Sequence, residues 1–228
     1  MNKAIFWDFH RTLAYSTHIW GNSLLKAAKT VCPDTSITFE QIEEHLTYGF
    51  PWQEPENDYT KITGSKWWDF MYMHFEKIYK MFGLSEQDSS RACVLAREMI
   101  LDYKKYSLYD DTISTLEACI EKGFKNYIVS NNYPELEELM KNLKILKYFD
   151  GLVVSAIIGY DKPRTEIFDY AKNIANNPEI CYMVGDSIEC DVYGGKRSGI
   201  KTILVHNPVT CNADYICENL CDILNVIE

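Results

Sequence analysis

The sequence lacks several features that would decide its class at once. None of its apolar stretches approaches the roughly 18 residues that a membrane-spanning helix needs. Basic residues are also scarce, because 23 Lys and Arg stand against 33 Asp and Glu, a net charge of −10. This charge argues against a protein that coats nucleic acid or binds an anionic membrane surface. A phosphorylated substrate is compatible with it, since a bound cation and a few basic side chains reverse the field locally.

Internal repeats, low-complexity segments and flexible linkers are missing as well. With 25% charged and 14% aromatic residues, the composition excludes disordered and fibrous classes. The N-terminus has no pattern of a secretory signal. We therefore expect a cytoplasmic protein whose eight cysteines are reduced thiols. Cys217 and Cys221, four residues apart, are expected to share the inner face of a C-terminal helix.

An α/β pattern interrupted by a helical stretch organises the chain. Residues 3–8 form an apolar run typical of a buried parallel strand. After residue 106 strands and helices alternate, which indicates a parallel sheet with helices on both faces. We expect strands at 127–130, 152–155, 181–185 and 202–205, and helices at 113–120, 135–146, 164–175 and 189–198.

Between these parts the pattern is helical and contains no convincing strand. Apolar residues recur at helical spacing over 19–31, 39–46, 67–82 and 92–103, and 49–66 predicts an extended loop. The predicted fold class is α/β, with a Rossmann-like, doubly wound parallel sheet. Its core comprises residues 1–14 and 107–228, and residues 15–106 form a helical insertion.

Polar side chains follow the predicted strands, where such sheets bind their ligands. They are Asp8, Ser130, Asn131, Lys162 and Asp186, with Asp191 five residues beyond the last strand end. Each signal alone is weak, since an Asp after a strand is more often a cap or turn residue. Together they are the groups needed to hold Mg²⁺ and a phosphoryl group.

The three carboxylates divide between direct and indirect roles. Mg²⁺ prefers oxygen ligands, which Asp8 and Asp186 supply. Asp191 is expected to orient a metal-bound water or the lysine without touching the metal. Asp8, in line with the phosphorus, is the candidate nucleophile that would form an aspartyl-phosphate.

The remaining groups suit the phosphate. The Ser130 hydroxyl and the backbone N–H of Asn131 are expected to donate to phosphate oxygens, next to the N-terminus of the following helix. Lys162 would cancel charge as a point cation.

In these motifs the chain resembles the haloacid dehalogenase superfamily over essentially its whole length. Asp8 and Thr12 match the first motif, Ser130 the second, and Lys162 followed by proline the third. Asp186 and Asp191, with the glycines around them, match the fourth. The resemblance implies a Mg²⁺ cofactor, Thr12 and Asp191 behind the direct ligands, and a helical cap formed by the insertion.

The chain departs from the family pattern at His10, which replaces the second Asp of the first motif. In the family's phosphatases that Asp is the general acid and base. The backbone carbonyl of His10 still offers the family's Mg²⁺ ligand at this position. An imidazole with a pKa near 6.5 can also exchange protons at neutral pH. We therefore expect His10 to be the acid and base, with the rate highest within about one unit of pH 6.5.

Three functions are compatible with these residues. The leading hypothesis is a Mg²⁺-dependent phosphatase of a small phosphorylated metabolite, without nucleic acid, membrane or protein partners. A metal-independent dehalogenase would also use an Asp nucleophile, but the pair Asp186 and Asp191 argues against it. A catalytically weakened, phosphate-binding regulatory protein is the third, and the intact Asp8 and Lys162 argue against it.

The aromatic residues of the insertion have two interpretations. Trp52, Trp67, Trp68 and Tyr72 are expected to form the core of the insertion more readily than a substrate pocket. Arg11, Tyr15 and Trp20 lie nearer the first motif and are the better pocket candidates.

Overall fold

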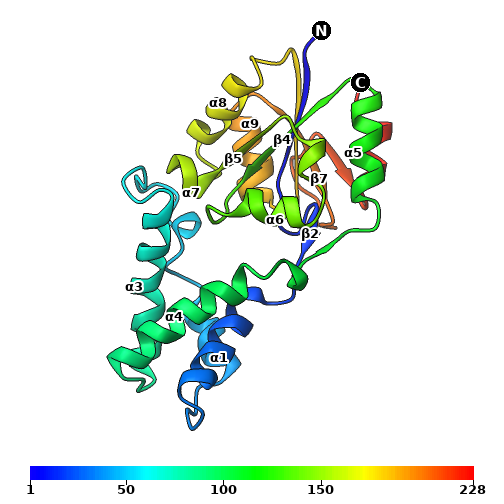
Figure 1. Cartoon of the computed structure of the whole chain (residues 1–228). Helices are drawn as coiled ribbons and strands as arrows, with labels where there is room; N and C mark the ends of the chain where they lie inside the picture. The colour runs from blue at the N-terminus through cyan, green and yellow to red at the C-terminus, as the bar shows by residue number, and fades with distance from the viewer.

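The apolar run at the N-terminus forms the central strand of a six-stranded parallel sheet. The computed structural model describes all residues, 1–228, and divides into two lobes (Figure 1). The upper lobe holds the sheet, in the order β5-β4-β1-β6-β7-β8. The strands are β1 (Lys3–Trp7), β4 (Lys125–Ser130), β5 (Gly151–Val154), β6 (Ile180–Gly185), β7 (Lys201–Val205) and β8 (Tyr215–Cys217). The predicted fold class is thereby confirmed.

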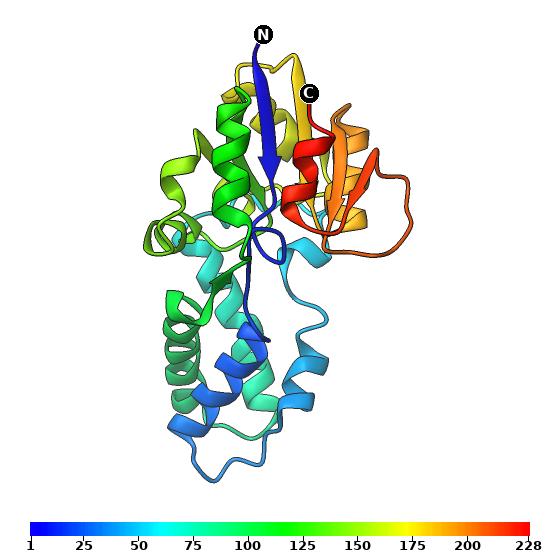
Figure 2. The same ribbon diagram turned by 90° about the vertical axis from the view of Figure 1, so that its right-hand side faces the viewer.

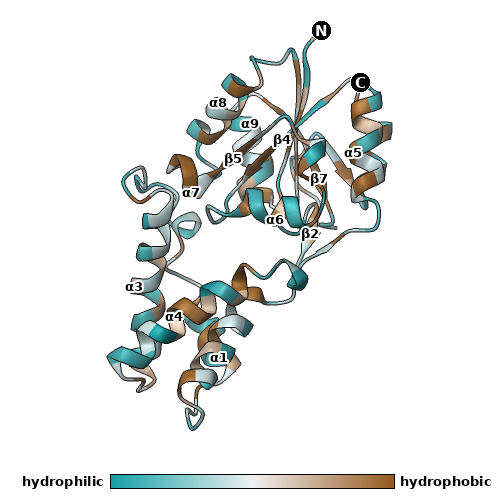
Figure 3. Cartoon of the chain, viewed as in Figure 1, coloured by the Kyte–Doolittle hydropathy of each residue, from teal (hydrophilic) through white to brown (hydrophobic).

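Alternate residues of β1 enter two separate cores because both faces of the sheet are covered. Ile5 and Trp7 join the larger core, together with residues of α5 (Thr112–Glu121) and α6 (Leu136–Asn142). Ala4 and Phe6 join the smaller core beneath α8 (Thr165–Ile174). Burial on both faces explains why the strand is a continuous apolar run, and the strands are accordingly brown in Figure 3.

The lower lobe is helical. It comprises α1 (Ile19–Val31), α2 (Phe39–His45), a 3₁₀ turn (Pro51–Gln53), α3 (Ser65–Met81) and α4 (Glu86–Ile100). The helix α2 starts at a capping box, in which Thr38 and Gln41 satisfy each other's backbone N–H groups. No helix of the chain is both long and apolar enough to span a membrane.

A narrow two-stranded ribbon joins the lobes (Figure 2). It pairs β2 (Ala14–Tyr15) with β3 (Ser107–Leu108) in antiparallel register. Sequence periodicity did not predict this ribbon, because two residues are too few for a repeat. We place the boundary of the helical lobe at this ribbon.

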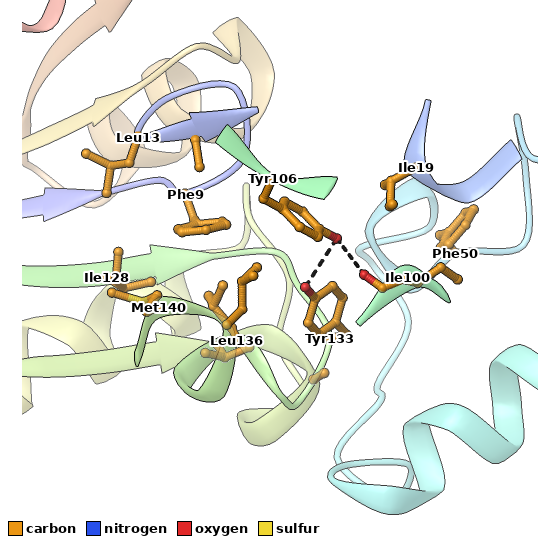
Figure 4. Close-up of a cluster of buried hydrophobic side chains, with 14 of the residues drawn as sticks. Phe9, Leu13, Ile19, Phe50, Ile100, Tyr106, Ile128, Tyr133, Leu136 and Met140 are labelled. Atoms are coloured by element: carbon orange, nitrogen blue, oxygen red, sulfur yellow. Dashed lines mark hydrogen bonds between the residues drawn. The ribbon is translucent and has the colours of Figure 1, made fainter. Parts of the chain in front are cut away.

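Apolar packing continues across the junction of the lobes (Figure 4). Phe9 and Leu13 lie on the sheet side of Tyr106, and Ile100 ends α4 on its other side. The hydroxyl of Tyr133 donates to that of Tyr106 at 3.2 Å, and Tyr106 donates to the Ile100 carbonyl at 3.0 Å. Both ring hydroxyls are thus satisfied although the rings are buried.

Some predicted elements differ from those observed. The predicted C-terminal helix is wrong, because Cys217 ends β8 in the sheet and Cys221 is exposed on a 3₁₀ turn (Leu220–Asn225). The helix predicted at 135–146 ends at Asn142, and a 3₁₀ turn follows (Leu146–Tyr148). A short helix α7 (Ser155–Ile158) was not predicted. The helix predicted at 189–198 is a π-helical turn (Ile188–Tyr193) followed by α9 (Gly194–Arg197). All eight cysteines are unpaired.

Candidate active site

The ends of adjacent strands bring the polar residues together. In the sheet, β1 lies between β4 and β6. Asp8 directly follows β1, Ser130 ends β4, and Asp186 directly follows β6. Because parallel strands end at the same edge, these three side chains meet at one place.

Asp8 is held by protein donors on both carboxylate oxygens. Its Oδ1 accepts hydrogen bonds from Ser130 Oγ at 3.0 Å and Lys162 Nζ at 2.8 Å. Its Oδ2 accepts only a long one, 3.4 Å, from Thr12 Oγ1. Asp8 is 9% exposed and lines a cavity, so the less engaged Oδ2 is the oxygen available to a ligand.

Lys162 is a buried cation between two carboxylates. Its Nζ lies 2.6 Å from Asp191 Oδ1 as well as 2.8 Å from Asp8 Oδ1. Burial lowers the pKa of Lys162, but the attraction of Asp191 and Asp8 outweighs this effect and holds the pKa above its ordinary value. The ammonium is therefore charged at neutral pH.

Both carboxylate oxygens of Asp191 are engaged by protein donors. Its Oδ1 accepts from Lys162, and its Oδ2 accepts from the backbone N–H of Ser187 at 3.0 Å. A Cβ at Gly185 would lie 2.1 Å from Asp191 Oδ2, so only glycine leaves room for this carboxylate. The geometry fits an orienting role for Asp191 better than direct metal binding.

The Asn131 side chain positions Lys162. Its Oδ1 accepts from the backbone N–H of Lys162 at 2.7 Å, and its Nδ2 donates to the backbone carbonyl of Lys162 at 2.9 Å. The amide thus clamps the loop that carries the lysine. This bidentate contact was not predicted, because the sequence does not indicate which loop faces residue 131.

Asp186 is the carboxylate with the fewest protein donors. Its Oδ2 lies 3.3 Å from Arg11 Nε, and the Arg11 side chain is 71% exposed. Burial, with the nearby charges of Asp8 and Asp191, raises the pKa of Asp186 to about 7. A cation bound beside Asp186 would offset the repulsion among these carboxylates.

The donor set fits Mg²⁺. Asp8, Asp186 and Asp191 each offer a carboxylate oxygen, and these oxygens lie within 4.8 Å of one another. In proteins Mg²⁺ is usually bound by the oxygens of one or two carboxylates, and waters and phosphate oxygens complete its coordination shell. Asp186 and the weakly engaged Oδ2 of Asp8 are the better candidates to hold the ion, because both oxygens of Asp191 already accept hydrogen bonds of 3.0 Å or shorter.

His10 is half-buried at the edge of the same cavity. Its Nε2 lies 2.8 Å from Ser16 Oγ, and its ring meets the Tyr106 ring edge-on at 6.4 Å. Burial lowers the pKa of His10 more than the Asp8 charge raises it. This lowered pKa moves the expected pH optimum from 6.5 toward the acid side.

The cavity, of about 460 Å³, lies between the two lobes. Its core end contains the carboxylates and Lys162, and its cap end contains side chains from the helical lobe. The cap end includes His18, Trp20, Glu43, Phe50, Trp52 and Gln53. Of these, only Trp20 was a favoured pocket candidate in the sequence. Arg11 also lines the cavity, whereas Tyr15, Trp67, Trp68 and Tyr72 do not.

Comparisons with known proteins identify the class. A haloacid dehalogenase-like hydrolase family model matches residues 3–199. The chain therefore belongs to this family and is an enzyme, a hydrolase, as its motifs predicted.

Individual relatives add detail. The chain is similar to a glyceraldehyde 3-phosphate phosphatase of Methanothermobacter thermautotrophicus, with 28% identity covering 98% of this chain and 94% of the relative. Its structure is similar to that of a 2-haloacid dehalogenase from Pseudomonas syringae, with TM-score 0.71, 17% identity and coverage of 99% and 98%. It is also similar to a HAD-hydrolase, YfnB, from Bacillus subtilis, with TM-score 0.72, 16% identity and coverage of 99% and 98%. The fold alone thus does not separate a phosphatase from a dehalogenase.

Proposed function

We propose that the chain is a Mg²⁺-dependent phosphatase that hydrolyses a small phosphate monoester through an aspartyl-phosphate on Asp8. One observation carries this proposal. Three carboxylates lie within 4.8 Å of one another around a single buried cation, Lys162. The negative charge exceeds what the lysine neutralises, and a divalent cation would supply the missing positive charge while also binding a phosphoryl oxygen.

Asp8 and Asp186, with the backbone carbonyl of His10, would hold the ion. When bound, Mg²⁺ neutralises charge on the phosphoryl oxygens and favours their attack by an anion. Asp191 and Thr12 stay behind these ligands. Asp191 orients Lys162, and Thr12 contacts Asp8 Oδ2.

The chain's own groups account for both chemical steps. A carboxylate oxygen of Asp8 attacks phosphorus, and the bond from phosphorus to the leaving oxygen breaks. The leaving oxygen takes a proton from the His10 imidazolium. In the second step neutral His10 accepts a proton from water, water attacks phosphorus, and the bond to Asp8 breaks. Lys162 and the Asn131 N–H stabilise the charge on the phosphoryl oxygens, and the Ser130 hydroxyl does so once it turns from Asp8 to the phosphate.

The helical lobe serves as a cap in this proposal. Residues 15–106 cover the cavity on the side opposite the carboxylates and shield the reacting atoms from bulk water. The flexible element would be the ribbon formed by β2 and β3.

A panel of substrates tests the function. Phosphate release from sugar phosphates, nucleotides, phosphoglycolate and p-nitrophenyl phosphate is measured with Mg²⁺ and with EDTA. We expect Mg²⁺-dependent release from at least one ester. Halide release from 2-chloropropionate is measured in parallel, and halide release that persists in EDTA would favour the dehalogenase instead. Beryllofluoride binding without turnover of any ester would favour the phosphate-binding regulatory protein.

A further inference from the structure

The cap end of the cavity presents flat aromatic surfaces. The half-buried rings of Trp20 and Trp52 both line it, with centroids 6.1 Å apart and planes inclined at 53°. We call these two rings the aromatic wall. A purely polar leaving group, such as a triose, gains little binding free energy from contact with it. A planar, unsaturated ring gains both apolar burial and stacking.

Neighbouring aromatic rings pack against both tryptophans. Trp52 stacks on Phe50, with centroids 4.6 Å apart and planes inclined at 19°, and also on Trp67. Trp20 meets the Phe50 ring at 4.9 Å. Phe50 and Trp67 are buried, so the wall cannot collapse without breaking the core of the cap. A wall ordered before binding costs little conformational entropy when a ligand packs on it.

The cap contributes a single carboxylate to the cavity lining. Glu43 lines the cavity, and its Oε2 lies 3.2 Å from His18 Nδ1. His18 holds the left-handed conformation (φ 45°, ψ 47°), which is unfavourable for a residue other than glycine. A Cβ at Gly21 would lie 2.0 Å from Glu43 Oε1, so glycine leaves the space that this carboxylate occupies. The start of α1 thus leaves room for Glu43 at Gly21 and brings His18, its partner, next to it.

The cap contributes no lysine or arginine to the cavity. The two such cations in the lining, Arg11 and Lys162, both belong to the core end. A second phosphate or a carboxylate on the leaving group would therefore face Glu43 and its partner His18, with no lysine or arginine of the cap to bind it. Repulsion between the Glu43 carboxylate and an anionic leaving group disfavours binding, so the cap selects against such groups.

We propose that the substrate is a nucleoside monophosphate, whose base packs on Trp20 and Trp52 and whose N–H or O–H groups donate to Glu43. This inference rests on the proposed phosphatase function. The cavity of about 460 Å³ is within the range of pockets that bury a ligand of this size. A nucleoside is uncharged, planar at the base and rich in donors, which matches all three properties of the cap end.

Kinetics with five esters test the inference. The kcat/KM values are compared for uridine and adenosine 5′-monophosphates, glyceraldehyde 3-phosphate, 2-phosphoglycolate and p-nitrophenyl phosphate. We expect the better nucleotide to exceed both small metabolites by at least about tenfold, mainly through a lower KM. If p-nitrophenyl phosphate is hydrolysed but neither nucleotide exceeds glyceraldehyde 3-phosphate, the inference fails and the phosphatase proposal stands. If no ester is hydrolysed, the phosphatase proposal itself fails.

Charge variants of the cap sharpen the test. Glu43→Gln should raise the nucleotide KM about 5- to 20-fold, because a hydrogen bond to a charged acceptor is lost. Glu43→Lys should shift the ratio of kcat/KM for phosphoglycolate over nucleotide upward by at least about tenfold. Glu44→Gln and Glu44→Lys, one position along α2 and exposed outside the cavity, are the matched controls. An equal shift in the Glu43 and Glu44 variants, with folding verified by circular dichroism, would overturn the assignment of Glu43.

Discussion

The two ends of the cavity are built on different principles. At the core end, Asp8, Lys162 and Asp191 are buried and tied together by hydrogen bonds of 2.6–2.8 Å. At the cap end, Glu43 and His18 are partly exposed and are joined by one contact of 3.2 Å. The core end is determined by backbone geometry at the strand ends, whereas the cap end depends on how loops and helices pack. We infer that chemistry resides in the first and substrate choice in the second.

The largest effect is expected from removing the proposed nucleophile. Asp8→Asn is nearly isosteric but gives a poor nucleophile and removes a charge from the metal site. Turnover should fall by at least about 10⁴-fold with every ester, while the circular dichroism spectrum stays unchanged. Asp169→Asn, at an exposed position on α8, is the control. Unfolding of Asp8→Asn would mean instead that Asp8 is structural.

The imidazole of His10 should matter in proportion to the leaving group. His10→Ala should slow alkyl phosphates by roughly 10²- to 10⁴-fold and p-nitrophenyl phosphate less, because p-nitrophenolate leaves without a proton. Mg²⁺ affinity should barely change, since only the backbone carbonyl is the expected ligand here. Equal rates for wild type and His10→Ala on an alkyl phosphate would make the imidazole a bystander. Recovery of a fast rate by His10→Asp would then favour a weakened phosphatase.

The same side chain predicts a pH dependence. Because burial lowers the pKa of His10, the imidazolium needed for the first step disappears as pH rises through that lowered pKa. At saturating Mg²⁺ the rate with an alkyl phosphate should therefore peak on the acid side of pH 6.5. An optimum that persists in His10→Ala would assign the pH dependence to another group.

The two ends also differ in how far the sequence predicted them. Asp8, Ser130 and Asp186 could be located because each follows an apolar run, and the topology of parallel sheets then brings strand ends together. Lys162 and Asp191 were located in the same way, by their distance from predicted strand ends, and the family resemblance, which is confirmed, matched them to its motifs. Which oxygen of each carboxylate is free could not be predicted, because that depends on contacts between distant loops.

The cap end left no comparable signal. Periodicity located α1 and α3, but it says nothing about which side chains face the opposite lobe. Glu43 and Gln53 resemble surface residues in the sequence, and the left-handed backbone of His18 has no local signature. Cys217 illustrates the same limit, since its strand is defined by pairing with β7 and not by its own three residues.

Breaking the buried ion pair between Lys162 and its two carboxylates should lower the unfolding free energy. Lys162→Met leaves Asp8 and Asp191 buried without a counter-charge, which costs about 3–5 kcal/mol of unfolding free energy in such cases. Urea denaturation in EDTA measures the loss, and Lys162→Met combined with Asp191→Asn should recover part of it. Lys141→Met, at an exposed position on α6, should change stability by less than about 0.5 kcal/mol. A loss no larger than this control would show that the core end is not held by charge.

Metal removal should expose the charge repulsion at Asp186. Its pKa is raised to about 7 in the folded protein, so the unfolded chain binds fewer protons between its ordinary pKa and pH 7. Stability without metal should consequently decrease as pH rises through this window, and Mg²⁺ should restore it most above pH 7. Thermal denaturation of wild type and Asp186→Asn in EDTA tests this, since the variant should give the flatter profile. Parallel profiles would assign the pH dependence to other buried carboxyl groups.

The smallest effect is expected where the two lobes are joined. Glu135, in the core lobe, accepts from Trp68 Nε1 at 2.8 Å and from Arg97 Nη2 at 2.5 Å, and both donors belong to the cap. The Arg97 guanidinium also lies 5.1 Å from the centre of the Trp68 ring. All three side chains therefore form one contact between the lobes, and none of them is among the residues proposed for chemistry.

A double-mutant cycle measures this contact. Glu135→Gln, Arg97→Met and their combination should give a coupling free energy of about 1 kcal/mol in urea denaturation, because the pair is only partly buried. The kcat/KM should fall less than tenfold and through KM, since a looser cap weakens binding without touching Asp8 or His10. Glu138→Gln, at an exposed position on α6, is the control. A fall in kcat as large as that of His10→Ala would break the separation of chemistry from selection, because it would show that cap position sets the rate of the chemical step.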